Sequence, residues 1–142
     1  MGKTGLDLHL TPELLGLDNI KIDSVHVADD GSIHIKVSST QTEILCRKCH
    51  KPTDPHGLGR PLTLRHLSLL GHEVYIEITP PRGICKNCDD TPTTTQTLSW
   101  YERNGHHTKP YNDYLLLQLV GSTLVDVVKK EGITVDILQG VI

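Results

Sequence analysis

All four cysteines of the chain occur in two Cys-x-x-Cys pairs, formed by Cys46, Cys49, Cys85 and Cys88. A two-residue gap lets one tight turn present two thiolates to one ion, and two such turns supply the four donors of a tetrahedral zinc site. Lys48 and Lys86 lie inside the pairs, where positive charge favours ionised sulfur. Residues 50–84 separate the pairs, a longer stretch than the roughly 15–20 residues of a minimal ribbon. The sequence therefore predicts a zinc-ribbon-like module with two inserted strands.

Other uses of the cysteines have less support. Two disulfides would need an oxidising compartment, and nothing in the sequence directs the chain to one. A thioredoxin-like site needs a single Cys-x-x-Cys pair in a βαβ context, which this chain lacks. Iron bound as in rubredoxin would use the same four sulfurs, and this alternative stays open. Among the histidines, adjacent His106 and His107 would point to opposite sides of an extended strand, so we expect the cysteines alone to bind the metal.

The composition agrees with a domain that needs a metal. The chain has 142 residues, 37% of them hydrophobic, with no Phe and one Trp, so few large side chains are available for a core. A structural metal stabilises such small domains. No apolar run approaches the roughly 20 residues of a membrane-spanning helix, and no secretion signal is recognisable. We therefore expect a cytoplasmic protein without membrane contact.

Charge divides the chain into three parts. Residues 1–43 carry three Lys against seven acidic residues, residues 44–110 carry nine Lys and Arg against six, and residues 111–142 carry two Lys against four. We accordingly expect an N-terminal hairpin segment over 1–43, a four-cysteine module over 44–100 and a helical segment over 101–142.

The periodicity of the sequence predicts an α+β fold. Alternating apolar residues on both sides of Asp30-Gly31 predict a hairpin over 17–38, with a bulge at Ser24. A helical turn from Thr11 to Gly16 precedes it. Two more strands, 61–70 and 72–79, are expected to join near Gly71, and polar residues 89–97 are expected to form a linker or an irregular extended segment.

The C-terminal part has a helical period. A buried helix is expected around Leu115, a second helix capped by Ser122 and ended by Gly132, and a third helix capped by Thr134. Asp126 and Lys130 have the spacing of an i, i+4 pair on the second helix. Two helices joined by a short turn that contains glycine are typical of a helix-turn-helix.

Basic residues gather in and between the cysteine pairs. The candidates for phosphate contact are Arg47, Lys48, Arg60, Arg65, Arg82 and Lys86. His56, His66 and His72 would extend the same basic surface, unless it is simply a solvated face. No phosphate-binding glycine loop, nucleophile elbow or His-Glu-x-x-His motif is present, and a zinc ion held by four thiolates has no open position. We therefore expect no catalysis by this chain.

The order of these parts resembles the N-terminal region of bacterial insertion-sequence transposases of the ISL-three family. The motifs are Leu14-Leu15-Gly16-Leu17, the first cysteine pair, His56, Arg60-Pro61-Leu62-Thr63-Leu64-Arg65-His66-Leu67, Gly71-His72-Glu73-Val74, Pro81-Arg82-Gly83-Ile84 before the second pair, and Val127-Val128-Lys129-Lys130-Glu131-Gly132-Ile133-Thr134. The resemblance begins near residue 12 and covers nearly all of the chain.

The resemblance implies binding of double-stranded DNA at the terminal inverted repeats of a mobile element. Catalysis in that family belongs to a later domain with Asp, Asp and Glu, which these 142 residues do not contain, so the chain would be a fragment or a truncated gene product. Because Glu131 to Ile142 holds no Lys or Arg, we expect the zinc module and its basic strands to make the main DNA contact. The helices would then help to position the chain or form a homodimer.

Two other interpretations remain open. In the first, the metal only stabilises a protein–protein interaction module, which the net charge of −3 favours. In the second, the chain is a degenerate remnant with no present role.

Overall fold

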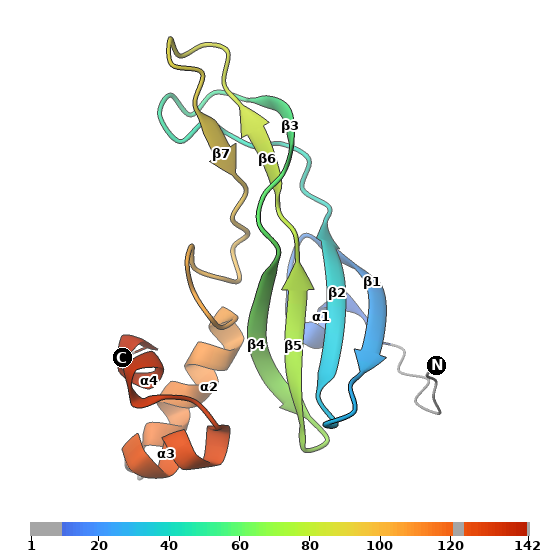
Figure 1. Cartoon of the computed structure of the whole chain (residues 1–142), viewed down its shortest axis with the longest axis vertical. Helices are drawn as coiled ribbons and strands as arrows, with labels where there is room; N and C mark the ends of the chain where they lie inside the picture. Colours follow the sequence, from blue (N-terminus) through green and yellow to red (C-terminus); the bar gives the residue numbers. More distant parts are fainter. Residues whose placement is uncertain (1–9, 121–123, 142) are drawn as a thin grey trace.

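The structure is a computed structural model that describes residues 10–120 and 124–141. It is an α+β fold with two β-sheets and C-terminal helices (Figure 1). The larger sheet has the order β1-β2-β5-β4, and its strands are β1 (Ile20–Val27), β2 (Ile33–Ser39), β4 (Leu62–Leu69) and β5 (His72–Ile78). Strands β2 and β5 are parallel, and the other neighbours are antiparallel. One sheet thus combines the N-terminal hairpin with two strands that lie between the cysteine pairs.

Local signals place the first hairpin correctly. The β1–β2 register shifts between Ile22 and Ser24, which confirms the expected bulge. At the turn, Asp30 accepts a 2.9 Å hydrogen bond from the backbone N–H of Ser32, and Gly31 has φ +89°. The preceding turn, α1 (Pro12–Leu15), begins after Thr11, whose hydroxyl caps it as predicted.

The smaller sheet has the order β3-β6-β7, with strands β3 (Asp54–Leu58), β6 (Pro81–Ile84) and β7 (Thr93–Thr95). Strand β7 lies inside the polar segment for which a linker or an irregular extended course was expected. Strand β3 had no signal in the sequence, because all of its residues are exposed and it contains Pro55 and Gly57. Without a buried face, a strand has no reason to alternate apolar and polar residues.

Strands from both sheets form one long antiparallel ribbon. Strands β3 and β4 follow each other in the chain and pair with β6 and β5 respectively. Between the two sheets, the backbone N–H of Gly59 donates a 2.7 Å hydrogen bond to the carbonyl of Pro80. The turn at Leu70 and Gly71 closes the ribbon at one end, and both cysteine pairs lie beyond its other end (Figure 1).

The C-terminal helices are α2 (Lys109–Leu119), α3 (Leu124–Glu131) and α4 (Val135–Val141). Gly132, at φ +69°, ends α3, and the hydroxyl of Thr134 accepts a 3.2 Å hydrogen bond from the Ile137 N–H at the start of α4, as predicted. The predicted cap Ser122 lies outside the described residues. Among the described residues, none of the helices is long and apolar enough to cross a membrane.

Buried side chains form two clusters. The larger one fills the space around the four-stranded sheet and contains Leu15, Leu17, Ile20, Ile33, Ile35, Val37, Leu64, Val74, Ile76, Ile78, Leu98, Trp100 and Tyr101. The smaller one joins the helices through Tyr111, Leu115, Val127 and Leu138. Neither cluster contains a residue of 44–58 or 81–95, two ranges that the structure describes completely. We call these two ranges the metal end.

Candidate metal centre

The ribbon brings the two cysteine pairs together. The first pair lies before β3 and the second follows β6. Because β3 and β6 are antiparallel, the start of one strand lies beside the end of the other, where Asp54 pairs with Ile84. The two cysteine turns are far apart in the sequence, but the pairing of β3 with β6 places them side by side.

The four sulfurs form one compact group. All four Sγ atoms lie within 4.8 Å of one another, and the Sγ atoms of Cys49 and Cys85 are 3.6 Å apart. A zinc tetrahedron with bonds of about 2.3 Å has sulfur–sulfur edges of about 3.8 Å, so the group has the size that such an ion requires. Cys46 and Cys85 are fully buried, and Cys49 and Cys88 are half-buried. The four cysteines thus form a site that could bind a metal ion such as zinc.

Matching backbone hydrogen bonds close the two turns. The N–H of Cys46 donates to the carbonyl of Lys51 at 2.8 Å, and the N–H of Cys85 donates to the carbonyl of Pro92 at 2.9 Å. Each turn also contains a residue in the left-handed region, His50 at φ +60° and Thr91 at φ +41°. Backbone hydrogen bonds thus give the two turns the same shape, and each turn presents its two sulfurs to the same point.

The thiols differ in acidity because their surroundings differ. Backbone N–H groups of Cys49 and Lys48 hold the pKa of the Cys46 thiol at about 6, and the Lys48 N–H lies 3.4 Å from its sulfur. Burial, followed by the neighbouring thiols, raises the pKa of Cys88 to about 12. Four thiolates cannot share so small a space without a cation, and a bound metal ion removes that conflict.

The donor set bears on the alternatives considered above, which were disulfides, histidine ligands and iron. All four cysteines are free thiols in the structure, so neither pair is a disulfide. Four sulfurs around one ion leave no open coordination position, which is the arrangement of a structural site. Among the described residues, no histidine belongs to a group of three or more potential metal ligands. The sulfur donors suit zinc and iron alike.

Acidic neighbours offset part of the basic charge at the metal end. Lys48 is paired with Asp90, and the Lys86 ammonium lies 3.5 Å from the Asp54 carboxylate. Arg47 donates from Nε to the carbonyl of Thr93 at 3.2 Å and makes no ion pair with a described residue. Two of the predicted phosphate contacts are thus already engaged by carboxylates.

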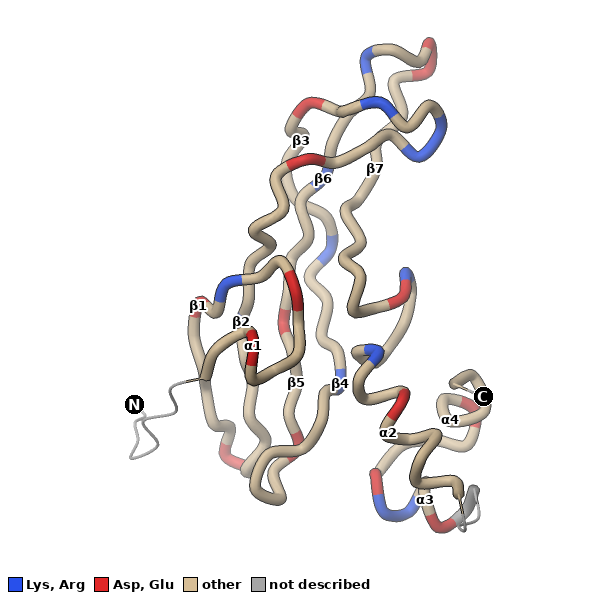
Figure 2. Tube along the Cα trace, turned by 180° about the vertical axis from the view of Figure 1, so that it is seen from behind, with Lys and Arg blue, Asp and Glu red and all other residues tan. Residues whose placement is uncertain are grey.

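The ribbon itself carries cations that have no acidic partner within the described ranges 10–120 and 124–141. Arg60 is exposed between β3 and β4, and Arg82 is half-buried on β6. Neither makes an ion pair with a described residue, and the same holds for exposed Lys51 and Arg103, which the sequence analysis did not single out. Figure 2 shows this basic charge spread from the metal end along the ribbon to the loop before α2.

The expectation that Arg65 is exposed to phosphates is wrong. Arg65 is only 7% exposed because its side chain lies between the sheet and the helices. Its guanidinium donates a 3.0 Å hydrogen bond to the carbonyl of Glu131, lies 3.6 Å from the Glu131 carboxylate, and stacks on the ring of Tyr111 at 4.8 Å. The same carboxylate accepts hydrogen bonds from Tyr111 and Tyr114. Burial and the bond to Glu131 raise the pKa of Tyr111.

His66 is also buried rather than part of a basic surface. Its Nε2 lies 2.9 Å from the carbonyl of Leu15, which can only accept, so Nε2 carries the proton. Nδ1 then accepts from the hydroxyl of Thr108 at 2.7 Å, and that hydroxyl accepts from the N–H of Tyr111. Burial lowers the pKa of His66. We call Arg65, His66, Thr108, Tyr111 and Glu131 the sheet–helix joint.

The remaining predicted histidines are exposed. His56 lies on β3, and His72 lies 2.7 Å from the carbonyl of Gly31 across the end of the larger sheet.

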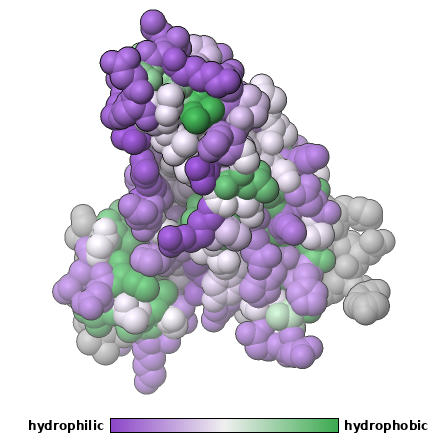
Figure 3. Space-filling model, turned by 45° about the horizontal axis from the view of Figure 1, so that its top comes forward, coloured by the Kyte–Doolittle hydropathy of each residue, from purple (hydrophilic) through white to green (hydrophobic). Residues whose placement is uncertain are grey.

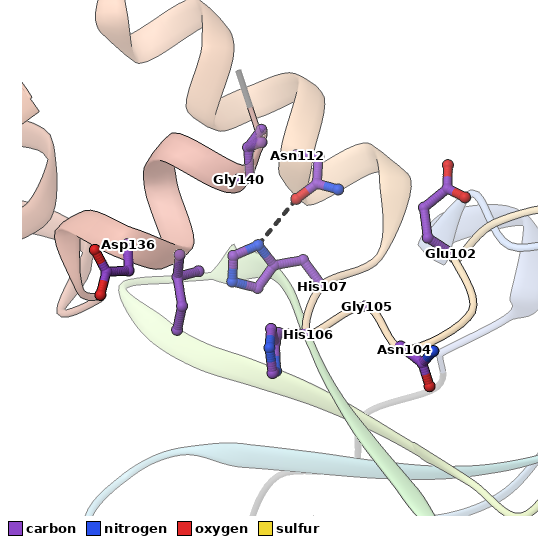
Figure 4. A pocket seen from close by; sticks show the side chains of 10 residues that line it. Glu102, Asn104, Gly105, His106, His107, Asn112, Asp136 and Gly140 are labelled. Carbon is purple, nitrogen blue, oxygen red and sulfur yellow. Dashed lines mark hydrogen bonds between the residues drawn. The ribbon is translucent and has the colours of Figure 1, made fainter.

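A cleft of about 400 Å³ lies between the loop 102–107 and helices α2 and α4 (Figure 4). In it, Nδ1 of His107 bonds Oδ1 of Asn112 at 2.9 Å, and burial lowers the pKa of His107. This bond fixes the orientation of the His107 ring.

The surface differs between the two ends of the molecule. Hydrophilic side chains dominate the metal end, whereas hydrophobic ones gather on the helical part (Figure 3). On α2 and just after it, Leu117 is 69% exposed and Val120 is 79% exposed.

Comparison with known proteins gave no match: no family model, curated protein or solved structure matches the chain.

Proposed function

We propose that this chain binds double-stranded DNA through a zinc-ribbon-like module, as the non-catalytic DNA-binding part of a transposase. The observation that carries the proposal is the four-cysteine cluster at the end of a ribbon whose arginines Arg60 and Arg82 make no ion pair with a described residue. The cluster would fix the ribbon without taking part in chemistry, because four sulfurs leave no position for a substrate. In this proposal the ion is zinc, and the terminal inverted repeats of a mobile element are the target.

The charges favour binding to the DNA backbone. Cations that lack an ion pair with a described residue can exchange their counterions for phosphates without breaking an existing contact. They are Arg47, Lys51, Arg60, Arg82 and Arg103. The proposal assigns α3, the turn at Gly132 and α4 the role of a helix-turn-helix that positions the chain or joins two copies. Since α4 has no Lys or Arg, it contributes little to phosphate binding.

The salt dependence of binding tests the proposal. Affinity for a duplex of random sequence falls with a slope of about −0.9 per phosphate contact, so three to five contacts predict a loss of roughly 40- to 500-fold between 50 and 200 mM salt. Fluorescence anisotropy of the zinc-loaded chain measures this slope. An affinity that does not change with salt, or no binding at 50 mM salt, contradicts the proposal.

A protein–protein interaction module is the second candidate function. The exposed apolar side chains of α2, chiefly Leu117, favour it, since an exposed helix face of this kind is typical of contact surfaces. The substitution Leu117→Lys separates the two functions. It would leave DNA affinity unchanged or slightly stronger if the ribbon binds DNA, and it would abolish partner binding if α2 is the contact surface. A chain that binds neither DNA nor a partner fits the degenerate remnant.

A further inference from the structure

A small pocket lies where the two sheets approach the loop before α2. Its volume is about 230 Å³, below the roughly 300–1,000 Å³ of pockets that enclose drug-sized ligands, so it suits a single small group. The side chains that matter for its chemistry are Arg60, Thr95, Gln96, Arg103 and Asn104. No Asp or Glu belongs to its lining.

The backbone fixes Arg60 at this pocket. A Cβ atom on the preceding Gly59 would come within 2.9 Å of the Thr95 methyl group and 3.2 Å of the Pro80 carbonyl oxygen. Only glycine therefore allows the ribbon to lie this close to the end of β7, and the hydrogen bond from Gly59 to Pro80 holds it there. The backbone that carries Arg60 is therefore held against β7 and Pro80.

Arg103 reaches the pocket from a tight turn. The Gly105 N–H donates a 2.9 Å hydrogen bond to the carbonyl of Glu102, and Asn104 between them has φ +64°. The Glu102 carboxylate lies 3.6 Å from Lys109, which leaves Arg103 without an acidic partner among the described residues. Figure 2 shows the basic segments between β3 and β4 and before α2.

The side-chain oxygen of Gln96 is a buried hydrogen-bond acceptor without a partner among the described residues. Its side chain is 5% exposed, its backbone N–H donates to Pro81, and its Nε2 donates to the Gln41 carbonyl at 2.8 Å. These bonds fix the amide, yet its buried Oε1 has no hydrogen-bond partner within the described part of the chain. A buried acceptor without a donor is unfavourable, and it belongs to a residue that lines the pocket.

We propose that this pocket binds a phosphate group between the guanidinium groups of Arg60 and Arg103. Arginine presents a planar pair of donors that matches phosphate oxygens, and no carboxylate of a described residue competes with an anion for either guanidinium. That the phosphate belongs to a DNA backbone rests on the proposed function, whereas the anion chemistry of the pocket does not.

Titration with inorganic phosphate tests the pocket itself. We expect saturable shifts of the NMR signals of Gln96 and of the Arg103 Nε–H, and at least tenfold weaker phosphate binding in Arg60→Gln and Arg103→Gln. Lys21→Gln is the matched control, because it removes one exposed charge from β1, at the opposite edge of the sheet from β4. Absence of saturable shifts, or equal phosphate affinity in all variants, overturns the proposal.

A second arm identifies the source of the phosphate. If it is a DNA backbone, the double variant Arg60→Gln/Arg103→Gln binds a random duplex at least tenfold more weakly than Lys21→Gln does, with an unchanged zinc content. If duplex binding stays equal while inorganic phosphate binding is lost, the pocket holds free phosphate and the proposed function survives without it. If the unaltered chain binds phosphate but no duplex, the proposed function fails and the pocket stands.

Discussion

The long ribbon joins the metal end to strands β4 and β5 of the four-stranded sheet, yet different interactions stabilise its two halves. The sheet buries a cluster of Ile, Val and Leu side chains, together with Trp100, on its covered face. The metal end contributes no residue to either hydrophobic cluster, and two of its most buried side chains are the thiols of Cys46 and Cys85. Burial of apolar surface therefore stabilises one half of the ribbon, and four sulfurs remain to stabilise the other.

Metal removal should give the largest difference in stability between the metal end and the four-stranded sheet. Structural zinc contributes about 10–16 kcal/mol of apparent binding energy, so a chelator or Cys85→Ser should unfold residues 44–58 and 81–95. Hydrogen exchange should then show lost protection there while β1, β2, β4 and β5 stay protected. Protection should return to the unaltered chain when zinc is restored, but not to the variant. Uniform loss across both sheets would show that the two regions fold as one unit.

Breaking the sheet–helix joint should lower the stability of the chain without affecting its zinc content. Glu131→Ala leaves buried Arg65 with only the half-exposed carboxylate of Glu73, 3.5 Å away, and removes the acceptor of two tyrosine hydroxyls, which should cost about 3–5 kcal/mol of unfolding free energy. Urea denaturation measures the loss, and zinc content should not change. The exposed Glu102→Ala, which breaks only the Lys109 pair, should cost less than about 1 kcal/mol. Equal effects of the two variants would contradict the buried network.

A smaller effect is expected at the contact between β3 and β6. A Cβ on Gly83 would lie 2.7 Å from the Thr53 Cβ, so Gly83→Ala should cost about 1–3 kcal/mol and weaken zinc binding. Gly140→Ala is the matched control, because nothing lies within 4 Å of its added Cβ and alanine favours α4 by about 1 kcal/mol. A Gly83→Ala chain with unchanged zinc affinity would mean that the two strands are not closely packed.

The smallest effect concerns pH. Because burial lowers the pKa of His66, its contribution to stability is present above the ordinary value of about 6.5 and is lost as the pH falls below it, when the unfolded chain binds the proton first. NMR of the imidazole should show the neutral ring, protonated on Nε2, persisting below pH 6. A ring that titrates at 6.5 or above would contradict the hydrogen bonds from Thr108 and to Leu15.

Local patterns predicted much of this molecule. The Cys-x-x-Cys spacing predicted that the four cysteines could bind one metal ion, and the alternation of apolar residues predicted the first hairpin with its bulge at Ser24. Both signals lie within a few neighbouring residues. Capping residues such as Thr11 and Thr134 also act over three positions. These features require no knowledge of distant parts of the chain.

The predictions for Arg65 and His66 were wrong because their surroundings depend on contacts between segments that are distant in the sequence. Arg65 meets Glu131 across 66 positions and His66 meets Thr108 across 42, so nothing near either residue distinguishes it from a surface cation. The expected strand over 61–70 agrees with β4, but its sequence could not show which of its side chains the helices would cover. Arg103 was missed for the same reason, since its relation to Arg60 arises only when the loop before α2 approaches the ribbon.

Native mass spectrometry of the purified chain tests the central claim most directly. The account predicts a compact ion whose mass exceeds that of the chain by one metal ion, with zinc expected, and whose metal is lost together with the narrow charge-state distribution. A compact chain without metal, or one lighter by two hydrogens for each oxidised pair of cysteines, would contradict it.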